Sequence, residues 1–173
     1  MMAKTVHVLI TRLGETDQLF LTAPSVDLAQ ERADLRQQLA RYSVQTGEQL
    51  YLLGEAAVLL ETVLVELEDV PTHAQVSGQL AGVYLQFYQL TQEQKYLTIV
   101  GQILRPLSGS LCPAVLLGLA RLDAARHKPA LTRHWLGRLL ALPNTCWTDV
   151  VDAPEFASWV KQPWFIALSD AGA

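Results

Sequence analysis

The sequence predicts a mainly α-helical fold, a short stack of antiparallel helix pairs preceded by a β-hairpin. The chain repeats itself faintly at a distance of about thirty-six residues, because Gly82 and Gly101 are nineteen residues apart, as are Gly118 and Gly137. Self-similarity of this length is typical of stacked helix pairs. Apolar residues recur at helical spacing through most of the chain, whereas residues 4–23 alternate.

Composition and charge narrow the class of protein. Half of the 173 residues are apolar and 17% are charged, which predicts one domain over residues 1–173 with a sizeable core. The net charge is −4 and Lys and Arg are scattered, so we expect no nucleic-acid partner. No secretory signal is visible, and no apolar run approaches the roughly 18 residues that span a bilayer. Two cysteines without a CxxC motif suit a reducing compartment. We therefore expect a cytoplasmic protein without a membrane partner.

Residues 4–23 predict the β-hairpin. Val6, Val8 and Ile10 alternate with their neighbours, and a Gly-containing loop at 14–17 separates them from a second short run at 18–22. An isolated two-stranded hairpin is marginally stable in water, so it should pack on helices or pair with another chain. The alternative is a poorly ordered N-terminal tail.

Residues 25–70 predict two long helices. Ser25 or Asp27 can cap the first, which should end near Ser43, because their side-chain oxygens accept the free N–H groups of a first turn. The second covers about residues 48–67 and has a wide apolar stripe, so we expect it at the centre of the core. Pro71 should end it, because proline disfavours a helical conformation in the preceding residue.

Residues 72–143 predict two further helix pairs, over 72–90 with 92–104 and over 113–126 with 129–142. Pro113 and Pro129 suit first helical turns, where an N–H group is not needed. Glycine costs about 1 kcal/mol relative to alanine inside a helix. The four glycines of the repeat therefore predict that the two helices of each pair cross closely.

The last segment, residues 146–173, predicts short capping helices. Open helical stacks need a terminal element that covers the apolar face of the last pair. The side chains expected to do so are Phe156, Trp159, Trp164, Phe165 and Leu168.

Residues 75–143 resemble two tetratricopeptide repeats. In that family, small residues face each other across the two helices and a proline follows the second. The matching residues are Gly82, Gly101 and Pro106 in the first copy, and Gly118, Ala130, Gly137 and, one residue late, Pro143 in the second. The departures are Gln94 in place of a small residue, and Thr98 and His134 in place of an aromatic one. The tail over residues 152–168 is similar to the closing segment of some bacterial members. The resemblance implies a short α-solenoid that binds protein.

No sequence pattern indicates catalysis. The chain has no phosphate-binding glycine loop, zinc-protease motif or serine-hydrolase motif. Asp123 precedes His127 by four residues, which is typical of a surface pair. Cys112 stands near a helix start, yet no histidine is placed to activate it. We expect no catalytic residues, no metal and no cofactor.

The resemblance places a partner-binding groove on the first helix of each pair. The side chains expected to line it are Val76, Gln79, Val83, Gln86, Phe87, Val115, Leu119 and Leu122. This lining is mainly apolar and suits an amphipathic helix or an extended apolar peptide. The alternative is a groove filled by the chain's own N-terminal helices or tail.

These expectations lead to a hypothesis about function. The first reading is a non-catalytic protein–protein interaction module, an adaptor or chaperone-like protein that binds a protein segment in the groove. The alternative is a structural subunit or homodimer that uses the N-terminal hairpin and helices. An enzyme with an unrecognised site is the third reading.

Overall fold

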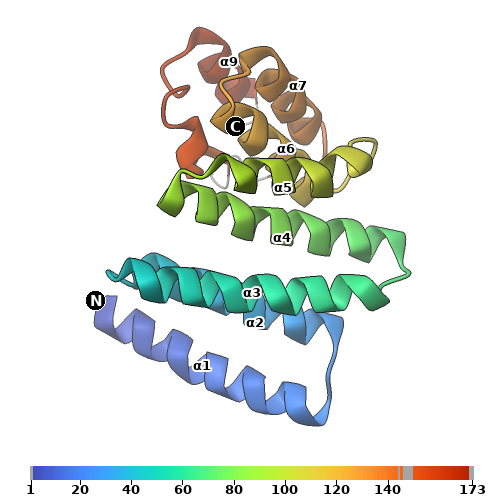
Figure 1. Cartoon of the computed structure of the whole chain (residues 1–173). Coiled ribbons are helices and arrows are strands. Elements are labelled where there is room, and N and C mark those ends of the chain that lie inside the picture. The colour runs from blue at the N-terminus through green and yellow to red at the C-terminus, as the bar shows by residue number, and fades with distance from the viewer. Residues whose placement is uncertain (1, 144, 146–149, 172–173) are drawn as a thin grey trace.

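The computed structural model describes residues 2–143, 145 and 150–171, and throughout this part of the chain the regular structure is helical (Figure 1). The helices lie close to the ranges that the sequence predicts after residue 25. Their bounds are α1 Met2–Thr22, α2 Val26–Tyr42, α3 Thr46–Glu66, α4 Val70–Thr91, α5 Gln94–Leu104, η1 Arg105–Leu107, α6 Pro113–Ala125, α7 Pro129–Leu140, η2 Pro154–Phe156 and α9 Pro163–Ala171.

The predicted N-terminal β-hairpin is wrong, because residues 2–22 form one continuous helix, α1. Val6, Leu9 and Leu13 are half-buried at helical spacing on the side that packs against α2. Val8 and Ile10, which suggested a strand, are 63% and 55% exposed on the other side. An alternation over only five residues is compatible with the two-residue period of a strand and with the 3.6-residue period of a helix. Packing against α2 stabilises the helix.

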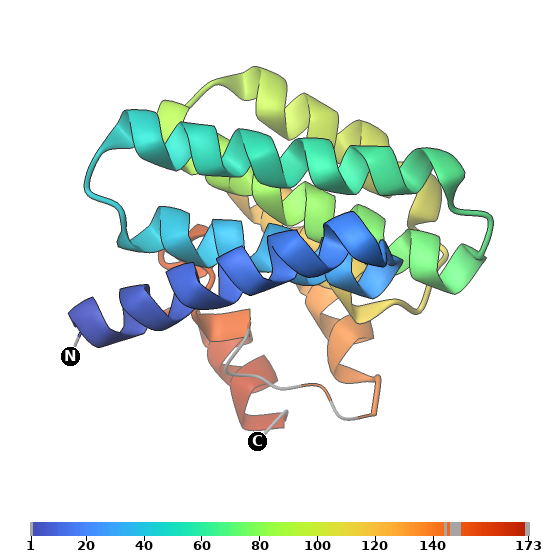
Figure 2. The same ribbon diagram turned by 90° about the horizontal axis from the view of Figure 1, so that it is seen from below.

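The helices form antiparallel pairs that stack on one another. Helix α2 packs against α3, α4 against α5 and α6 against α7, while α4 also contacts α3 and α6. Figure 1 shows this order, with α1 at one end of the stack and α9 at the other. Seen from below, α1 crosses α2 on the outside of the stack (Figure 2).

Local sequence signals position the helix ends. The Ser25 hydroxyl accepts a hydrogen bond from the Leu28 N–H at 3.2 Å at the start of α2. The Asp69 carboxylate caps α4 by accepting from the Thr72 N–H at 2.9 Å. Pro71 lies in the first turn of α4, and α6 and α7 each begin at a proline, where no N–H is lost.

Two apolar cores hold the stack together. One lies among α2, α3 and α4 and includes Leu53, Leu60 and Val83. The other joins α4, α5, α6, α7 and the tail, with Leu119 and Phe156 fully buried in it. Helix α4 contributes to both, so it is the central element of the fold. Of the α1 residues whose side chains are described, none belongs to either core.

The close helix crossing lies between α4 and α6, the first helices of successive pairs. A Cβ added to Gly78 would lie 2.5 Å from the Cβ of Ala114 and 2.8 Å from its carbonyl carbon. A Cβ added to Gly118 of α6 would lie 2.6 Å from Cδ1 of Leu104, at the end of α5, and 3.9 Å from the Cβ of Ala81 on α4. The prediction that glycines face each other within each pair therefore needs correction. The other glycines of the repeat are Gly82, Gly101 and Gly137. A Cβ added to any of them would meet no atom closer than 3.7 Å.

Candidate functional site: a groove across α2, α4 and α6

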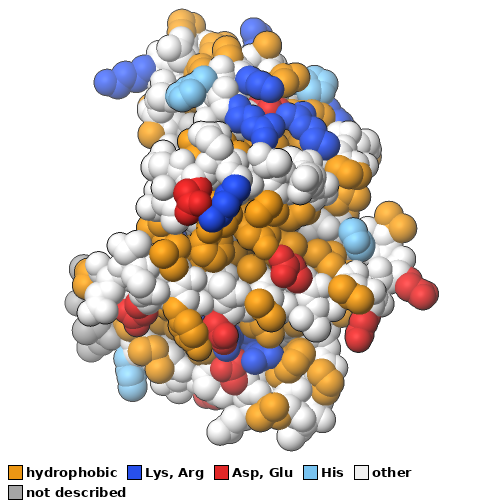
Figure 3. Space-filling model, in the orientation of Figure 1, with side chains coloured by type: hydrophobic (Ala, Val, Ile, Leu, Met, Phe, Trp, Pro, Cys, Tyr) orange, Lys and Arg blue, Asp and Glu red, His pale blue; other side chains and the backbone are white. Residues whose placement is uncertain are grey.

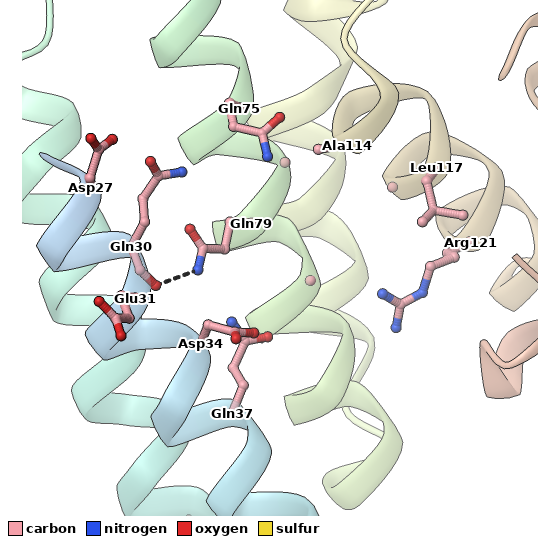
Figure 4. A pocket seen from close by; sticks show the side chains of 13 residues that line it. Asp27, Gln30, Glu31, Asp34, Gln37, Gln75, Gln79, Ala114, Leu117 and Arg121 are labelled. Carbon is pink, nitrogen blue, oxygen red and sulfur yellow. Dashed lines mark hydrogen bonds between the residues drawn. The ribbon is translucent and has the colours of Figure 1, made fainter. Parts of the chain in front are cut away.

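A groove of about 560 Å³ crosses the first helices of the three pairs, α2, α4 and α6. Figure 4 shows α2 as one wall, α4 as the floor and α6 as the other wall. The lining residues are Asp27, Gln30, Glu31, Asp34 and Gln37 from α2, Gln75, Gly78, Gln79 and Gly82 from α4, and Ala114, Leu117, Gly118 and Arg121 from α6.

The floor of the groove is made by residues with little or no side chain. At Gly78 and Ala114, α4 and α6 approach each other closely. Neither residue has a side chain large enough to project into the groove, so the groove is deep at this point. One turn further along α4, a Cβ added to Gly82 would meet only the ends of the Arg121 and Gln37 side chains, both at 3.9 Å. Glycine at 82 is therefore not required by packing, yet it keeps this part of the groove open.

The α2 wall is acidic. Oε1 of Glu31 accepts from Nε of Arg12 at 2.6 Å, so this carboxylate is paired within the chain. Asp34 accepts a hydrogen bond from the Gln38 amide at 2.6 Å. Among the described residues, neither Asp34 nor Asp27 has a cation within ion-pair distance. Two exposed carboxylates on this wall are therefore free to meet a positive charge from outside.

Glutamine side chains bridge the helices around the groove. Nε2 of Gln79 donates to the Gln30 carbonyl at 2.9 Å, and its buried Oε1 has no hydrogen-bond partner. Nε2 of Gln86 donates to Oε1 of Gln37 at 3.1 Å. These bonds tie α4 to α2 and fix the spacing of the groove walls. They also place amide groups, which donate and accept hydrogen bonds, along its length.

The C-terminal tail contacts Arg121 at one end of the groove. Glu155 of η2, with its side chain 4% exposed, accepts two hydrogen bonds from Arg121, at 3.0 and 3.1 Å. It also accepts from the Gln89 amide at 2.7 Å. Beyond this contact a second hollow of about 690 Å³ shares Leu117 and Arg121 with the groove. The tail therefore borders the groove at one end and leaves the part over α2 and α4 open.

The structure places most of the predicted groove residues inside the protein. Five of them are 0% exposed and belong to the cores: Val76, Val83, Val115, Leu119 and Leu122. Phe87 is half-buried and stacks on Tyr96 with ring centroids 5.0 Å apart. Gln79 lines the groove, and Gln86, 8% exposed, lines the second hollow. Eight of the thirteen residues that line the groove have polar side chains, and the rest are Gly, Ala and Leu. Apart from Gln79, they come from other positions of α4 and α6 and from α2.

Apart from Gln79, the residues that line the groove differ from the predicted ones, because adjacent residues of a helix point about 100° apart. Gly78 and Gly82 on α4, like Ala114 and Gly118 on α6, are four residues apart and so share a face. That spacing of small residues was the available signal. The contribution of α2 had no comparable signal, because sequence periodicity does not reveal which helices meet.

The side chains that the sequence offered for chemistry have other surroundings than expected. No group of three His, Cys, Asp or Glu side chains among them is arranged to hold a metal ion. Asp123, expected on the surface beside His127, is fully buried and accepts from Trp135 Nε1 at 2.9 Å and from Arg105 at 2.6 Å. Cys112 donates to Oε1 of Gln75 at 3.4 Å, and Cys146 lies outside the described residues. Within the same ranges, no helix has the length and apolar character to cross a membrane.

Comparisons with known proteins add no family to this description. No protein-family model matches the chain, and searches of curated proteins and of solved structures find no match either. The resemblance of residues 75–143 to tetratricopeptide repeats therefore stays a prediction. The function has to be argued from the groove and the surface of the helices themselves.

Proposed function

We propose that this chain is a protein-interaction module that holds an extended segment of a partner in the groove across α2, α4 and α6. The observation that carries the proposal is an open groove of about 560 Å³ on helices that are otherwise packed against one another. Gly78 and Gly82 on the floor, and Ala114 and Gly118 on the α6 wall, have little or no side chain, which leaves room for the backbone of a partner. This geometry supports an adaptor role.

The chemistry of the lining favours a polar segment with basic side chains. Asp27 and Asp34 face outward on one wall without a cation, so a Lys or Arg of the partner would complete ion pairs there. The exposed amide side chain of Gln75 can pair with the N–H and C=O groups of an extended backbone. This replaces the apolar peptide that the sequence suggested. Binding should weaken with salt, because exposed charges are screened.

The test is selection of binding peptides from a displayed random library on the folded protein. We expect the selected peptides to be enriched in Lys and Arg. Asp34→Lys should weaken their affinity at least about tenfold, equal to about 1.4 kcal/mol. Gly82→Leu, which fills the floor, should do the same.

Gly137→Leu is the matched control, since an added Cβ there meets nothing within 4 Å and α7 does not line the groove. Circular dichroism would establish that each variant keeps its helices. If the selected peptides bind Asp34→Lys and Gly82→Leu as tightly as the unchanged protein, the groove is not the binding site. A selection that yields no ligand also counts against the proposal.

A second candidate is self-association through α1. The side chains of Val8, Ile10, Leu19 and Leu21 are between 50% and 84% exposed on this helix. Exposed apolar side chains gathered on one element favour contact with another protein surface. Sedimentation velocity over a range of concentrations checks it, and a monomer at every concentration would exclude this candidate.

A further inference from the structure

The outward face of α3 has an exposed apolar stripe. Helix α3 packs against α2 and α4. On its outward side Tyr51, Val58 and Val65 are 65%, 62% and 86% exposed. Successive members of this set are seven residues apart, which is about two helical turns, so all three lie on one face of the helix. Figure 3 looks onto the side of the molecule where α3 lies in front, and hydrophobic and acidic side chains lie together across it.

Two glycines lie in the same stripe at the same spacing. Gly47 and Gly54 precede Tyr51 and Val58 by four residues each, so they share their face. A Cβ added to either glycine would meet nothing within 4 Å. Glycine destabilises a helix interior, and the packing of this chain does not require it here. A helix from outside could approach the backbone of α3 closely at these positions.

Acidic residues flank the stripe. Between Arg41 and His73 the sequence holds no Lys, Arg or His. Glu55, 46% exposed in its side chain, approaches Arg36 of α2 at 3.9 Å, and Glu61 accepts from the Tyr84 hydroxyl. The acidic residues of this segment are Glu48, Glu55, Glu61, Glu66, Glu68 and Asp69. The charges that α3 itself contributes are therefore all negative, and Arg36 of α2 is a cation beside them.

A hollow of about 320 Å³ lies beside the C-terminal half of α3. Phe20 and Val26 form one side of it, and Val63 and Leu67 of the α3 end form the other. Glu66 stands at the same hollow. An apolar side chain of a partner would find an apolar socket here, next to a carboxylate.

We propose that this face of α3 docks an amphipathic helix of a partner protein that carries Lys or Arg beside its apolar stripe. The apolar stripe and the glycines fit a helix laid along α3. The charge selects the partner, since cations of the docked helix would face Glu48, Glu55 and Glu66. A second copy of α3 would bring carboxylates together, and an anionic lipid surface would be repelled. The face is separate from the groove, so one chain would join two partners.

The probe is a fluorescent amphipathic helical peptide of about 18 residues, five turns, with Leu along one face and Lys on both flanks. A second peptide has Glu in place of each Lys. We expect the Lys peptide to bind the full chain and the Glu peptide to bind at least about tenfold more weakly. Val58→Lys should weaken binding of the Lys peptide by a similar factor. Val8→Lys, at a 63% exposed valine of α1, is the matched control and should change nothing.

Four other outcomes would overturn the inference. Equal loss in Val58→Lys and Val8→Lys would mean unspecific attraction to an acidic protein. A dimer in sedimentation that Val58→Lys dissociates would assign the face to a second copy. Binding to vesicles of phosphatidylcholine and phosphatidylserine that Val58→Lys abolishes would assign it to lipid. Loss of the Lys peptide in Asp34→Lys would place the helix in the groove instead, which leaves the groove proposal intact.

Discussion

The two ends of the chain are both fastened to the helix stack, but by different interactions. Helix α1 lies on α2 and, in its described part, contributes no side chain to either apolar core. The tail contributes Phe156 and Phe165, 0% and 2% exposed, to the larger core. The difference indicates that the tail is part of the cooperative unit, whereas α1 can open by itself.

Charged side chains hold α1 in place. Oδ1 of Asp17 accepts from Arg32 at 2.6 Å, and Oδ2 accepts from Arg36 at 3.1 Å. The Arg32 guanidinium also lies 4.3 Å from the centre of the Phe20 ring. Ion pairs that are partly open to solvent contribute about 0–1 kcal/mol each. The attachment of α1 is therefore specific in register but weak.

Apolar burial holds the tail. The Phe156 and Phe165 rings lie 5.9 Å apart between centroids, and Trp159 and Trp164 pack against the same core. Burial of a phenylalanine side chain contributes about 1.5–3 kcal/mol. The ion pair of Glu155 with Arg121 adds to this in a site shielded from water, with side chains 4% and 16% exposed. Together, the buried rings and the shielded ion pair stabilise the attachment of the tail more than the few partly exposed ion pairs stabilise that of α1.

The largest expected effect is on the tail. Phe156→Ala should lower the free energy of unfolding by about 3–5 kcal/mol, because it removes a fully buried ring and leaves a cavity. Urea denaturation followed by tryptophan fluorescence measures this. Phe20→Ala, the corresponding change at a half-buried ring of α1, should cost about 1 kcal/mol or less. Equal costs at the two positions would contradict the comparison.

The second largest loss of stability is expected when the ion pair of the tail is broken. Glu155→Gln leaves the Arg121 guanidinium without its carboxylate in a shielded site and should cost about 2–3 kcal/mol. The same denaturation experiment measures it. In a double-mutant cycle, Arg121→Gln in the Glu155→Gln background should cost much less than Arg121→Gln alone. Additive costs would mean that the two side chains do not stabilise each other.

Helices and their ends could be predicted wherever a local signal marks them. Pro113 and Pro129 start α6 and α7 because their missing N–H groups are not needed there. The alternation of Val6, Val8 and Ile10 led to the wrong prediction of a strand, because α1 is exposed on one side and packs against α2 on the other. Its half-buried residues follow a helical period that a five-residue window cannot separate from a strand.

The groove could be located only in part. The expectation that α4 and α6 line it agrees with the lining residues, but Val83 and Leu119 point into the cores instead. Because α4 contributes to both cores, most of its apolar residues are taken up by packing, and the face left over is Gly and Gln. The acidic wall with Asp34 comes from α2, whose place in the groove depends on tertiary contacts.

The smallest expected effect is at α1. Asp17→Asn should lower the free energy of global unfolding by about 1 kcal/mol or less, because the ion pairs that it breaks are partly exposed. It should nevertheless loosen α1, which hydrogen exchange of the α1 amides detects, while the amides of α4 stay protected. Arg12→Gln, at a more exposed pair with Glu31, is the control and should loosen α1 less.

The effect of Asp17→Asn should depend on pH in a defined direction. Burial by itself raises the pKa of Asp17, but hydrogen bonds and charge from Arg32 and Arg36 outweigh it, so the pKa lies below its usual value of 3.8. A carboxylate with a lowered pKa stabilises the folded state above its unfolded pKa, and this stabilisation is lost as pH falls through the folded pKa. The difference in exchange between Asp17→Asn and the unchanged protein should therefore persist from neutral pH to about pH 4 and disappear below that. Glu31 and Glu55, which face Arg12 and Arg36, are present in both proteins, so their contribution cancels in this difference. A difference already lost at pH 6 would show that the charge of Asp17 does not hold α1.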